Sequence, residues 1–495
     1  MLPKIPKIMS TQHPDNVSLP FFAETPDMSG EDEIQEAYYA FSHLGCDEQM
    51  WDSEGKEVDD FVVKKLLTKY PYFFKKKRLG EEVFLTLRVP NPAVEREEAK
   101  ILVEALESIP RSMDAAKLFY GDNPPPPIFE VILPMTTSSE DLNRVYYFYR
   151  NFISGKQHQA IYPGSITVAE WVGDFLPEKI NVIPLFEDVS YMLKADEILR
   201  DFLKDKEESY LRVFLARSDP ALNYGVVAAV LANKIALVKL YKLSQEIEKE
   251  FFPILGAGSP PFRGNLSPYT VDYVLSEYPC VETFTVQSAF KYDNPIEDVI
   301  TAIKRLKSFV RYPIEDFDEK RALKFIEKTS EEYRSIVEKI APLVNLISRY
   351  VPKRRMRKLH VGLFGYSRQV GTVTLPRAIG FCAACYSIGL PPEILGFSAL
   401  NKEELKELKE FYKNLEIDLS LAMRYFNPKS LELVPEVKEN ILKALNLINC
   451  LDLKVEADLD HREITKSIIK DLKKENYLNL TPLIIEAGLL RRFLG

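Results

Sequence analysis

Short apolar runs recur along the whole chain, and turn or polar residues bound each of them. Most are rich in valine, isoleucine, leucine and phenylalanine and do not alternate with polar residues, which is typical of strands buried on both faces of a parallel sheet. The runs are residues 4–11, 83–89, 128–135, 180–187, 211–218, 251–257, 281–288 and 359–366. We therefore predict eight strands.

Helical patterns lie between these runs. They cover residues 139–152, where Ser139 is a plausible N-cap, and residues 194–205, 224–251 and 296–310. A strand followed by a helix, repeated eight times, predicts an α/β fold of the (β/α)₈ TIM-type barrel class. An open, doubly wound sheet with fewer strands is the alternative.

The remaining segments predict how the chain is divided. Residues 1–390 form the predicted barrel, with helical insertions at about 31–80 and 319–351. From residue 391 to residue 495 the chain is rich in leucine, lysine and glutamate, which predicts an α-helical C-terminal region packed on the barrel.

Composition narrows the class of protein. A chain of 495 residues with 46% hydrophobic residues can bury a large core, and a net charge of −8 gives no overall basic field for nucleic acid or an anionic membrane. Five scattered cysteines suit a reducing compartment, so we expect a cytoplasmic protein. The first 30 residues lack the apolar core of a signal peptide, and no run reaches the roughly 18 apolar residues of a membrane span.

Polar residues follow the predicted strands, and in such a barrel the carboxyl ends of all strands meet at one mouth. Candidate site residues at these ends are His13, Arg88, Glu187, Asp219, Arg263, Gln287, Arg368 and, beyond the last loop, Arg377. Mg²⁺ is typically bound by one or two carboxylates plus oxygens of a phosphorylated substrate, and Glu187 and Asp219 supply two from adjacent strands. Guanidinium groups match phosphate and carboxylate, so the mouth suits a small phosphorylated carboxylate.

Eight motifs occur in an order that resembles the phosphoenolpyruvate carboxylase family, in its short archaeal type. They are STQHPDN (10–16), FLTLRVPNP (84–92), ILPMTTSSEDL (132–142), VIPLFED (182–188), FLARSDPALNYG (214–225), GAGSPPFRGN (256–265), FTVQSAFKY (284–292) and GYSRQVGTVTLPRAIG (365–380). The resemblance covers most of the chain to about residue 400, and the opening motif with GCDEQMWDSEGKEVD (45–59) is highly specific.

The resemblance implies a role for each candidate. Glu187 and Asp219 become ligands of Mg²⁺ or Mn²⁺, and His13 becomes the active-site histidine. Arg88, Arg368 and Arg377 would bind the substrate's phosphate and carboxylate, Arg263 would lie near bicarbonate and the transferred phosphate, and Gln287 would lie beside them. The implied substrates are phosphoenolpyruvate and bicarbonate, and the implied assembly is a homotetramer.

The implied reaction has two stages. Bicarbonate oxygen attacks phosphorus, which gives carboxyphosphate and a metal-stabilised enolate of pyruvate. A base then removes the carboxyphosphate proton, and the enolate attacks the released CO₂ to form oxaloacetate and phosphate. We expect His13 to be that base, because an imidazole with a pKa near 6.5 changes charge at working pH. Water must be excluded, so we expect a lid at residues 366–376 and a second gate at 258–267.

The sequence departs from the longer bacterial and plant branch at three places. That branch has a histidine and a second arginine in its FHGRGG loop, where this chain has Leu255 and Ala257, and a lysine after its SDS motif, where Leu222 stands. This chain ends in RRFLG, without the asparagine of the longer branch's RNTG ending.

Other readings remain open. Another barrel enzyme that forms a pyruvate enolate, such as a phosphoenolpyruvate mutase or a citrate-lyase-type aldolase, would share much of the mouth. A non-catalytic RNA-binding or scaffold protein could use the basic runs KKKR (75–78) and KRRMRK (353–358), although such runs are more often solvated faces or subunit contacts. We place the second run at the non-catalytic end of the barrel. Cys382 and Cys385 form a CxxC within an apolar helical pattern, which favours core packing over a redox pair.

Overall fold

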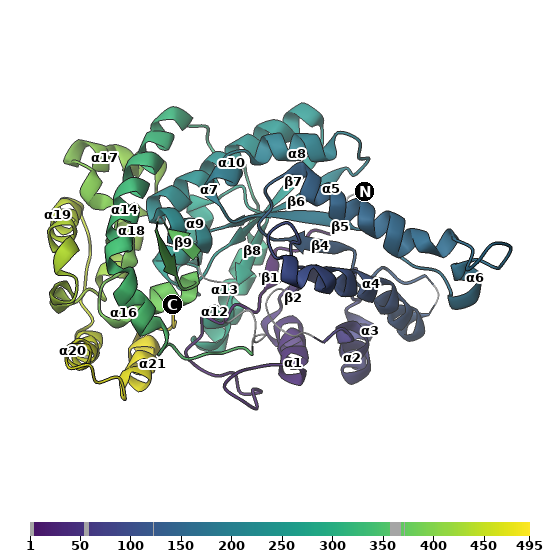
Figure 1. Ribbon diagram of the computed structural model, residues 1–495, viewed down its shortest axis with the longest axis horizontal. Coiled ribbons are helices and arrows are strands. Elements are labelled where there is room, and N and C mark those ends of the chain that lie inside the picture. The colour runs from purple at the N-terminus through teal and green to yellow at the C-terminus, as the bar shows by residue number, and fades with distance from the viewer. Residues whose placement is uncertain (1–3, 54–58, 122, 357–367, 371) are drawn as a thin grey trace.

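A closed barrel of eight parallel strands forms the centre of the molecule in the computed structural model, which describes residues 4–53, 59–121, 123–356, 368–370 and 372–495 (Figure 1). The strands follow chain order around the barrel, and β1 pairs with both β2 and β8. Their bounds are β1 Ile8–Ser10, β2 Glu48–Asp52, β3 Phe84–Arg88, β4 Glu130–Leu133, β5 Asn181–Phe186, β6 Tyr210–Ala216, β7 Glu250–Gly256 and β8 Thr283–Val286. The predicted fold class is confirmed.

One predicted strand is replaced by another. Seven of the predicted runs overlap barrel strands, but the remaining strand is β2, which we had placed inside a helical insertion. Its sequence, EQMWD, escaped the search because three of its five buried residues are polar. Glu48 is buried there because it forms an ion pair with Arg212 of β6, with 2.6 Å between Oε2 and Nη2. The predicted strand at 359–366 lies outside the described residues, and the barrel closes without it.

Helices surround the barrel and extend it at one end. Their bounds are α1 Glu31–Tyr39, α2 Val62–Lys69, α3 Pro71–Lys76, α4 Ala99–Tyr120, α5 Ser139–Phe148, α6 Val168–Val172, α7 Val189–Met192, α8 Ala195–Leu203, α9 Ser218–Tyr224, α10 Val226–Ile247, α11 Val271–Glu277, α12 Ser288–Tyr292, α13 Ile296–Ser308, α14 Glu319–Ser348, α16 Ala378–Ser387, α17 Lys402–Phe411, α18 Leu415–Met423, α19 Lys438–Ile448, α20 Leu459–Lys473 and α21 Leu480–Arg491. The N-cap of α5 is Ser138 rather than Ser139, because the Ser138 hydroxyl accepts the Asp141 N–H.

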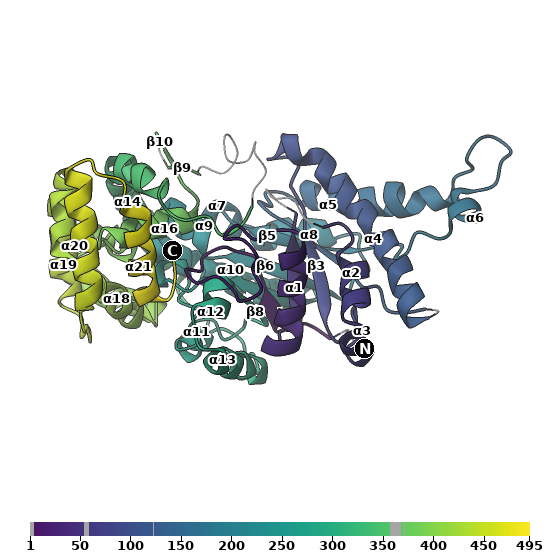
Figure 2. The same ribbon diagram turned by 90° about the horizontal axis from the view of Figure 1, so that it is seen from below.

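Helix α10 is buried over most of its length. Apolar residues cover every side of it, because it packs between the barrel and the neighbouring helices α8, α9 and α14. The predicted insertion at 319–351 is the single long helix α14. Helices α17 to α21 gather at one end of the molecule, as Figures 1 and 2 show, and the division of the chain into two domains at residue 391 stays a prediction.

Two further features bear on the predictions made from the sequence. Cys382 and Cys385 lie fully buried in α16 as free thiols, which agrees with core packing.

Within the described residues no single helix has both the length and the apolar composition needed to cross a bilayer. The pair formed by Ala378–Ser387 and Pro392–Ala399, bent by 99°, passes that test only when its halves are combined.

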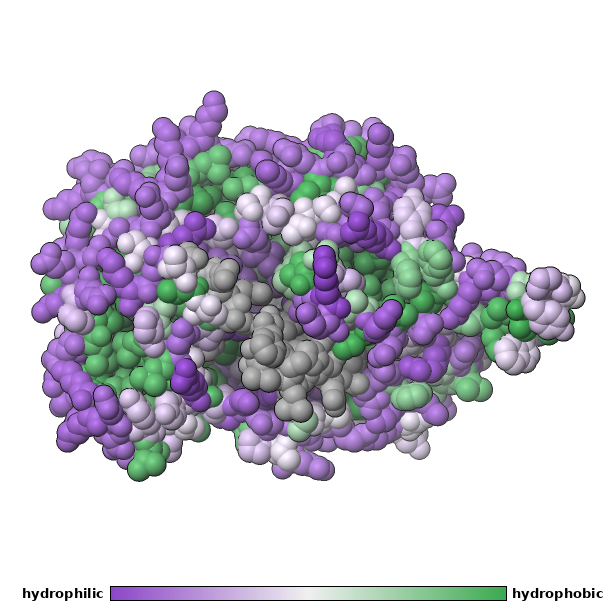
Figure 3. Space-filling model, viewed as in Figure 1, coloured by the Kyte–Doolittle hydropathy of each residue, from purple (hydrophilic) through white to green (hydrophobic). Residues whose placement is uncertain are grey.

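A projecting arm lies at the end of the molecule opposite α17 to α21, with α6 near its tip (Figures 1 and 3). Large apolar side chains on this arm are exposed, including Trp171, Tyr162 and Ile166. This apolar surface differs from the mostly hydrophilic surface that covers much of the face in Figure 3.

Candidate active site

A cavity of about 500 Å³ opens at the carboxyl ends of the barrel strands. Most of the candidate residues line it, although they come from seven separate segments of the chain: His13, Arg88, Glu187, Asp219, Arg263, Gln287 and Arg377. Arg368 begins strand β9 (Arg368–Val370), which pairs with β10 (Val373–Leu375), but its side chain lies outside the described residues. The barrel thus brings together the side chains that sequence order keeps apart.

Glu187 and Asp219 reach this cavity from neighbouring strands. Glu187 directly follows β5, and Asp219 lies in the first turn of α9, after β6, which pairs with β5. The Met135 N–H donates to Glu187 Oε2 at 2.8 Å, and Arg88 Nη2 lies 3.5 Å from Glu187 Oε1. Met135 has a φ of 48°, a left-handed conformation that is strained for this residue type. The Glu187 carboxylate is therefore held in a fixed orientation beside the cavity.

The donor set fits a hard cation. Two carboxylates supply oxygen ligands, which Mg²⁺ and Mn²⁺ prefer, and Mg²⁺ commonly keeps waters and substrate oxygens in its other positions. Throughout the described ranges, no three His, Cys, Asp or Glu side chains gather as a closed metal site. The pair therefore suits a cation that shares its coordination with a substrate, rather than a structural ion enclosed by protein.

Two guanidinium groups, those of Arg88 and Arg377, reach the cavity from different parts of the chain. Arg88 Nη1 lies 3.3 Å from both carboxylate oxygens of Asp52, the last residue of β2, and its side chain is buried. Arg88 thus bridges Asp52 and Glu187, so it is fixed between two acidic side chains. Arg377 lies at the N-cap position of α16 and lines the cavity. Both arginines therefore lie at the barrel mouth, where the sequence analysis placed them.

Arg263 forms hydrogen bonds through each of its three guanidinium nitrogens. Its Nε donates to Ser218 Oγ at 3.1 Å, and its Nη1 donates to Asp15 Oδ2 at 3.1 Å and to the main-chain oxygen of Gly495 at 2.7 Å. Its Nη2 donates to Gln287 Oε1 at 2.6 Å. Since a guanidinium has five N–H donors, one Nη2 hydrogen is left for a ligand among the described contacts. Gln287 is therefore a direct partner of Arg263.

The loop that carries Arg263 has a glycine, Gly258, at the position where any side chain would collide with the Arg263 guanidinium. A Cβ atom on Gly258 would lie 2.9 Å from the Arg263 guanidinium carbon. Residues 257–265 are buried, and two side chains hold the loop from outside: Glu393 accepts the Phe262 N–H at 2.7 Å, and Asp418 accepts from Asn265 Nδ2 at 2.6 Å. Burial raises the pKa of both carboxyl groups to about 7. The loop is thus packed from both sides in this structure, and the gate at 258–267 stays a prediction.

His13 follows β1 and is half-buried at the cavity. Its Nδ1 lies 2.9 Å from Thr11 Oγ1. Burial, and then the positive charge of Arg88, lower the pKa of His13 from 6.5 to about 3. The imidazole is therefore neutral at working pH in the ligand-free protein, where we had expected a pKa near 6.5. A neutral ring is the form that can accept a proton.

Two acidic partners of the cavity's arginines, Asp52 and Asp15, were absent from the sequence prediction. Asp52 was missed with strand β2, although it lies inside the GCDEQMWDSEGKEVD stretch. Asp15 was missed although it stands two residues after His13, because nothing in the pattern shows that it pairs with Arg263.

The basic run at 353–358 was assigned to the wrong end of the barrel. Residues 353–356 line the cavity, and Arg354 and Arg355 are buried. Helix α14 explains this position, because its C-terminal end reaches the cavity through Ser348 and delivers the chain to the mouth.

Comparison with known proteins gives consistent results. Residues 5–495 match the family model described as phosphoenolpyruvate carboxylase. The chain is 54% identical to the phosphoenolpyruvate carboxylase of Methanothermobacter thermautotrophicus over 492 residues, which is 99% of this chain and 100% of the relative. It is 51% identical to that of Methanospirillum hungatei with the same coverage, and 48% identical to that of Halobacterium salinarum over 99% of each chain.

Solved structures give a much weaker likeness. An HpcH/HpaI aldolase from Desulfitobacterium hafniense aligns with a TM-score of 0.34 and 13% identity, covering 62% of this chain and 95% of the aldolase. That level of similarity supports no conclusion about this chain.

Proposed function

The chain belongs to the phosphoenolpyruvate carboxylase family, and from this premise we propose how its residues carry out the reaction. It is a carboxy-lyase that converts phosphoenolpyruvate and bicarbonate to oxaloacetate and phosphate. One observation carries the proposed site: Glu187, Asp219 and three of the candidate arginines line the same cavity as His13. The roles below follow from that arrangement.

Glu187 and Asp219 hold a divalent cation, Mg²⁺ or Mn²⁺, in this proposal. When bound, the cation supplies positive charge that favours a developing negative charge on the substrate. Glu187 is suited to this role because the Met135 N–H and Arg88 fix its carboxylate before a ligand arrives. A carboxylate that is already oriented needs no rearrangement on binding.

The arginines bind the anionic groups of phosphoenolpyruvate. Arg88 and Arg377 contribute positive charge at the lining of this cavity, where charges interact more strongly than in bulk solvent. Arg263 offers its remaining Nη2 hydrogen to bicarbonate or the transferring phosphoryl group, and Gln287 orients it. Their role in the first stage is to neutralise charge as the phosphoryl group passes to a bicarbonate oxygen.

His13 takes the proton of carboxyphosphate in the second stage. The ring is neutral before substrate binds, and a bound anion would offset the positive charge of Arg88, which contributes to the low pKa of His13. Release of CO₂ then lets the enolate carbon form the new carbon–carbon bond. Arg368 and the β9–β10 hairpin are the proposed lid that keeps water from protonating the enolate to pyruvate.

The assembly and the location of the protein are also proposed. We propose a homotetramer in the cytoplasm, with small-molecule substrates and neither nucleic acid nor membrane as a partner. The exposed apolar side chains of the projecting arm support self-association, because a surface of this kind normally meets another surface. Light scattering of the purified protein measures the mass of the assembly.

Bicarbonate dependence tests the proposed function. Purified protein with phosphoenolpyruvate and Mg²⁺ is assayed for oxaloacetate through malate dehydrogenase, and for phosphate, with and without bicarbonate. We expect equal amounts of both products, and no product when bicarbonate or metal is removed. A mutase or an aldolase would show no bicarbonate-dependent release of phosphate. A non-catalytic RNA-binding protein would show steep, salt-dependent RNA affinity and no turnover.

A further inference from the structure

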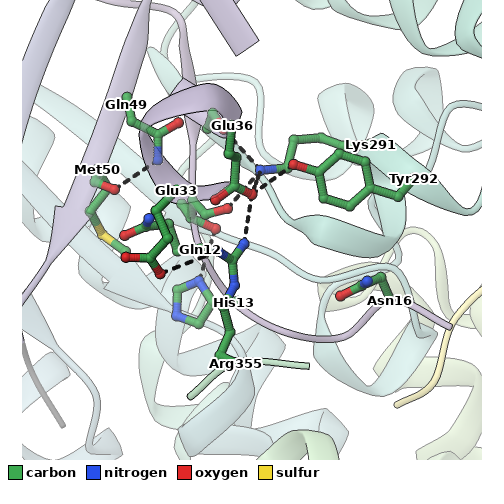
Figure 4. Close-up of polar contacts among 12 residues, drawn as sticks. Gln12, His13, Asn16, Glu33, Glu36, Gln49, Met50, Lys291, Tyr292 and Arg355 are labelled. Carbon is green, nitrogen blue, oxygen red and sulfur yellow. Dashed lines mark hydrogen bonds and ion pairs between the residues drawn. The ribbon is translucent and has the colours of Figure 1, made fainter. Parts of the chain in front are cut away.

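Four charged side chains form a buried cluster next to the cavity, and the steps above use none of them. Glu36 and Glu33 come from α1, Lys291 from α12 and Arg355 from the 353–356 segment (Figure 4). Glu36 Oε1 accepts from Lys291 Nζ at 2.9 Å, from Arg355 Nη2 at 2.6 Å and from the Tyr292 hydroxyl at 2.7 Å. Arg355 Nη1 also lies 3.3 Å from Glu33 Oε1. Two positive and two negative charges therefore balance within the cluster.

Lys291 connects this cluster to the strand end that carries His13. Its ammonium donates to Ser10 Oγ at 3.0 Å and to the Thr11 carbonyl at 2.9 Å, in addition to Glu36. An ammonium group has three donors, so all three are used. Thr11 in turn holds the His13 ring through its hydroxyl. One buried side chain thus fixes Ser10, the last residue of β1, and Thr11, which follows it.

Arg355 connects the cluster to the wall of the cavity. The residue lines the cavity with His13, and its neighbours attach the segment to the N-terminal part of the chain. The Met28 N–H donates to the Arg354 carbonyl at 3.3 Å, and the Met356 N–H donates back to the Met28 carbonyl at 3.2 Å. Arg354 Nη2 donates to the Val17 carbonyl at 2.8 Å. The 353–356 segment is therefore fixed to the same N-terminal part of the chain that supplies His13.

Stability alone is a weak reason for such a cluster. The side chains of Lys291 and Glu36 have no exposed area, and those of Arg355 and Glu33 have 2% and 1%. Removing four charges from water is costly, and apolar side chains of similar volume often fill such a space with equal or greater stability. The contacts of Lys291 and Arg355, in contrast, lead to the strand end before His13 and to the cavity wall.

We infer that Lys291, Glu36 and Arg355 are positioning residues for the carboxylation step, which hold the end of β1, and with it His13, against the 353–356 segment of the cavity wall. This inference rests on the proposed function, in which His13 acts after the phosphoryl transfer. If the ring is displaced, the enolate still forms, but CO₂ is released more slowly and the enolate persists longer before it is carboxylated. More of it is then protonated to pyruvate. The ratio of pyruvate to oxaloacetate therefore reports on the position of His13.

The test is a charge-balanced double variant, Glu36→Gln with Lys291→Met. Glu33 and Arg355 still balance each other in it, so we expect it to fold. The control is Lys234→Met with Glu277→Gln, a buried pair 2.7 Å apart between α10 and α11, outside the cavity lining. Melting temperature, kcat, KM for both substrates and the product ratio are measured for both variants and the parent protein. We expect similar melting temperatures for the two variants, but a kcat at least about tenfold lower and a higher pyruvate ratio only in the first.

The outcomes separate the inference from the function beneath it. If the parent protein shows no bicarbonate-dependent product, the proposed function itself fails. If the parent carboxylates phosphoenolpyruvate and both double variants keep its kcat and product ratio, the positioning role is overturned. Should the Glu36→Gln, Lys291→Met protein fail to fold, Arg355→Lys decides the matter, because it retains the charge but cannot bridge Glu33 and Glu36 in the same way. A lower kcat with a higher pyruvate ratio supports the inference, and parental values contradict it.

Discussion

Replacing Arg263 with methionine should destabilise the protein and abolish its activity, and the two effects should be separable. The Arg263 side chain is 2% exposed, and its partner Asp15 is fully buried, 3.1 Å away. Asp15 also accepts the Ala289 N–H at 2.7 Å, so it cannot turn toward water when its partner is lost. Breaking one side of a buried pair typically costs about 3–5 kcal/mol, and we expect a loss of that size in the free energy of unfolding at pH 8.

The loss should depend on pH in a definite direction. Burial raises the pKa of Asp15 above its usual value even though Arg263 opposes that shift. Without Arg263 the pKa rises further, so the folded variant binds a proton at a pH where the unfolded chain does not. Protonation therefore stabilises the folded variant, and its deficit relative to the parent protein should shrink as the pH falls from 8 toward 5.

A second substitution separates stability from catalysis. Asp15→Asn combined with Arg263→Met removes both charges, so we expect most of the lost stability to return while oxaloacetate formation stays absent. Urea unfolding at pH 5.5 and pH 8 and the malate dehydrogenase assay measure the two properties. Arg200→Met, at an exposed ion pair with Glu246, is the control and should change the unfolding free energy by less than about 1 kcal/mol. Parental stability of Arg263→Met at pH 8 would refute the ion pair, and activity in the double variant would refute a catalytic role.

Three further predictions follow from the site. Glu187→Gln and Asp219→Asn should each raise the Mg²⁺ concentration required for activity by about 100-fold or more, and calorimetry with Mg²⁺ alone should show the same loss; unchanged metal binding would remove that residue from the site. His13 should stay neutral between pH 5 and 8 in the ligand-free protein, because burial and Arg88 lower its pKa to about 3. Its contribution to stability should be lost only as the pH falls below about 6.5, where the unfolded chain binds a proton and the folded protein does not. An NMR titration midpoint near 6.5 would contradict this. Gly495→Ala should lower kcat by about tenfold, because a Cβ atom there would lie 2.5 Å from the Ala383 nitrogen and displace the main-chain oxygen that accepts from Arg263. A parental kcat would show that this contact is dispensable.

Part of this architecture could be predicted from the sequence, because buried parallel strands have a strong apolar signal. The runs around β5 and β6 placed Glu187 and Asp219 correctly at neighbouring strand ends. Strand β2 was missed for the opposite reason: Glu48 is buried through an ion pair with Arg212, and no apolar pattern records a charge balanced by a distant partner.

The partners within the site could not be predicted at all. Arg263 bonds to Asp15, Gln287 and Gly495, which lie in the first, the middle and the last part of the chain. Only the closed barrel and the returning C-terminal helices bring them together. The run at 353–358 shows the same limit. A basic run in a sequence usually indicates a solvent-exposed surface, whereas helix α14 leads Arg355 into a buried cluster.

Crystals of the protein soaked with Mn²⁺ and phosphoenolpyruvate offer the most direct test of the central claim, that two carboxylates from neighbouring strands share one cation among the arginines. The anomalous signal of manganese locates the ion without reference to the expected site. One peak within about 2.2 Å of an oxygen of Glu187 and of Asp219 is the predicted result. A peak held by other residues, or none beside these two carboxylates at full substrate occupancy, would contradict the account.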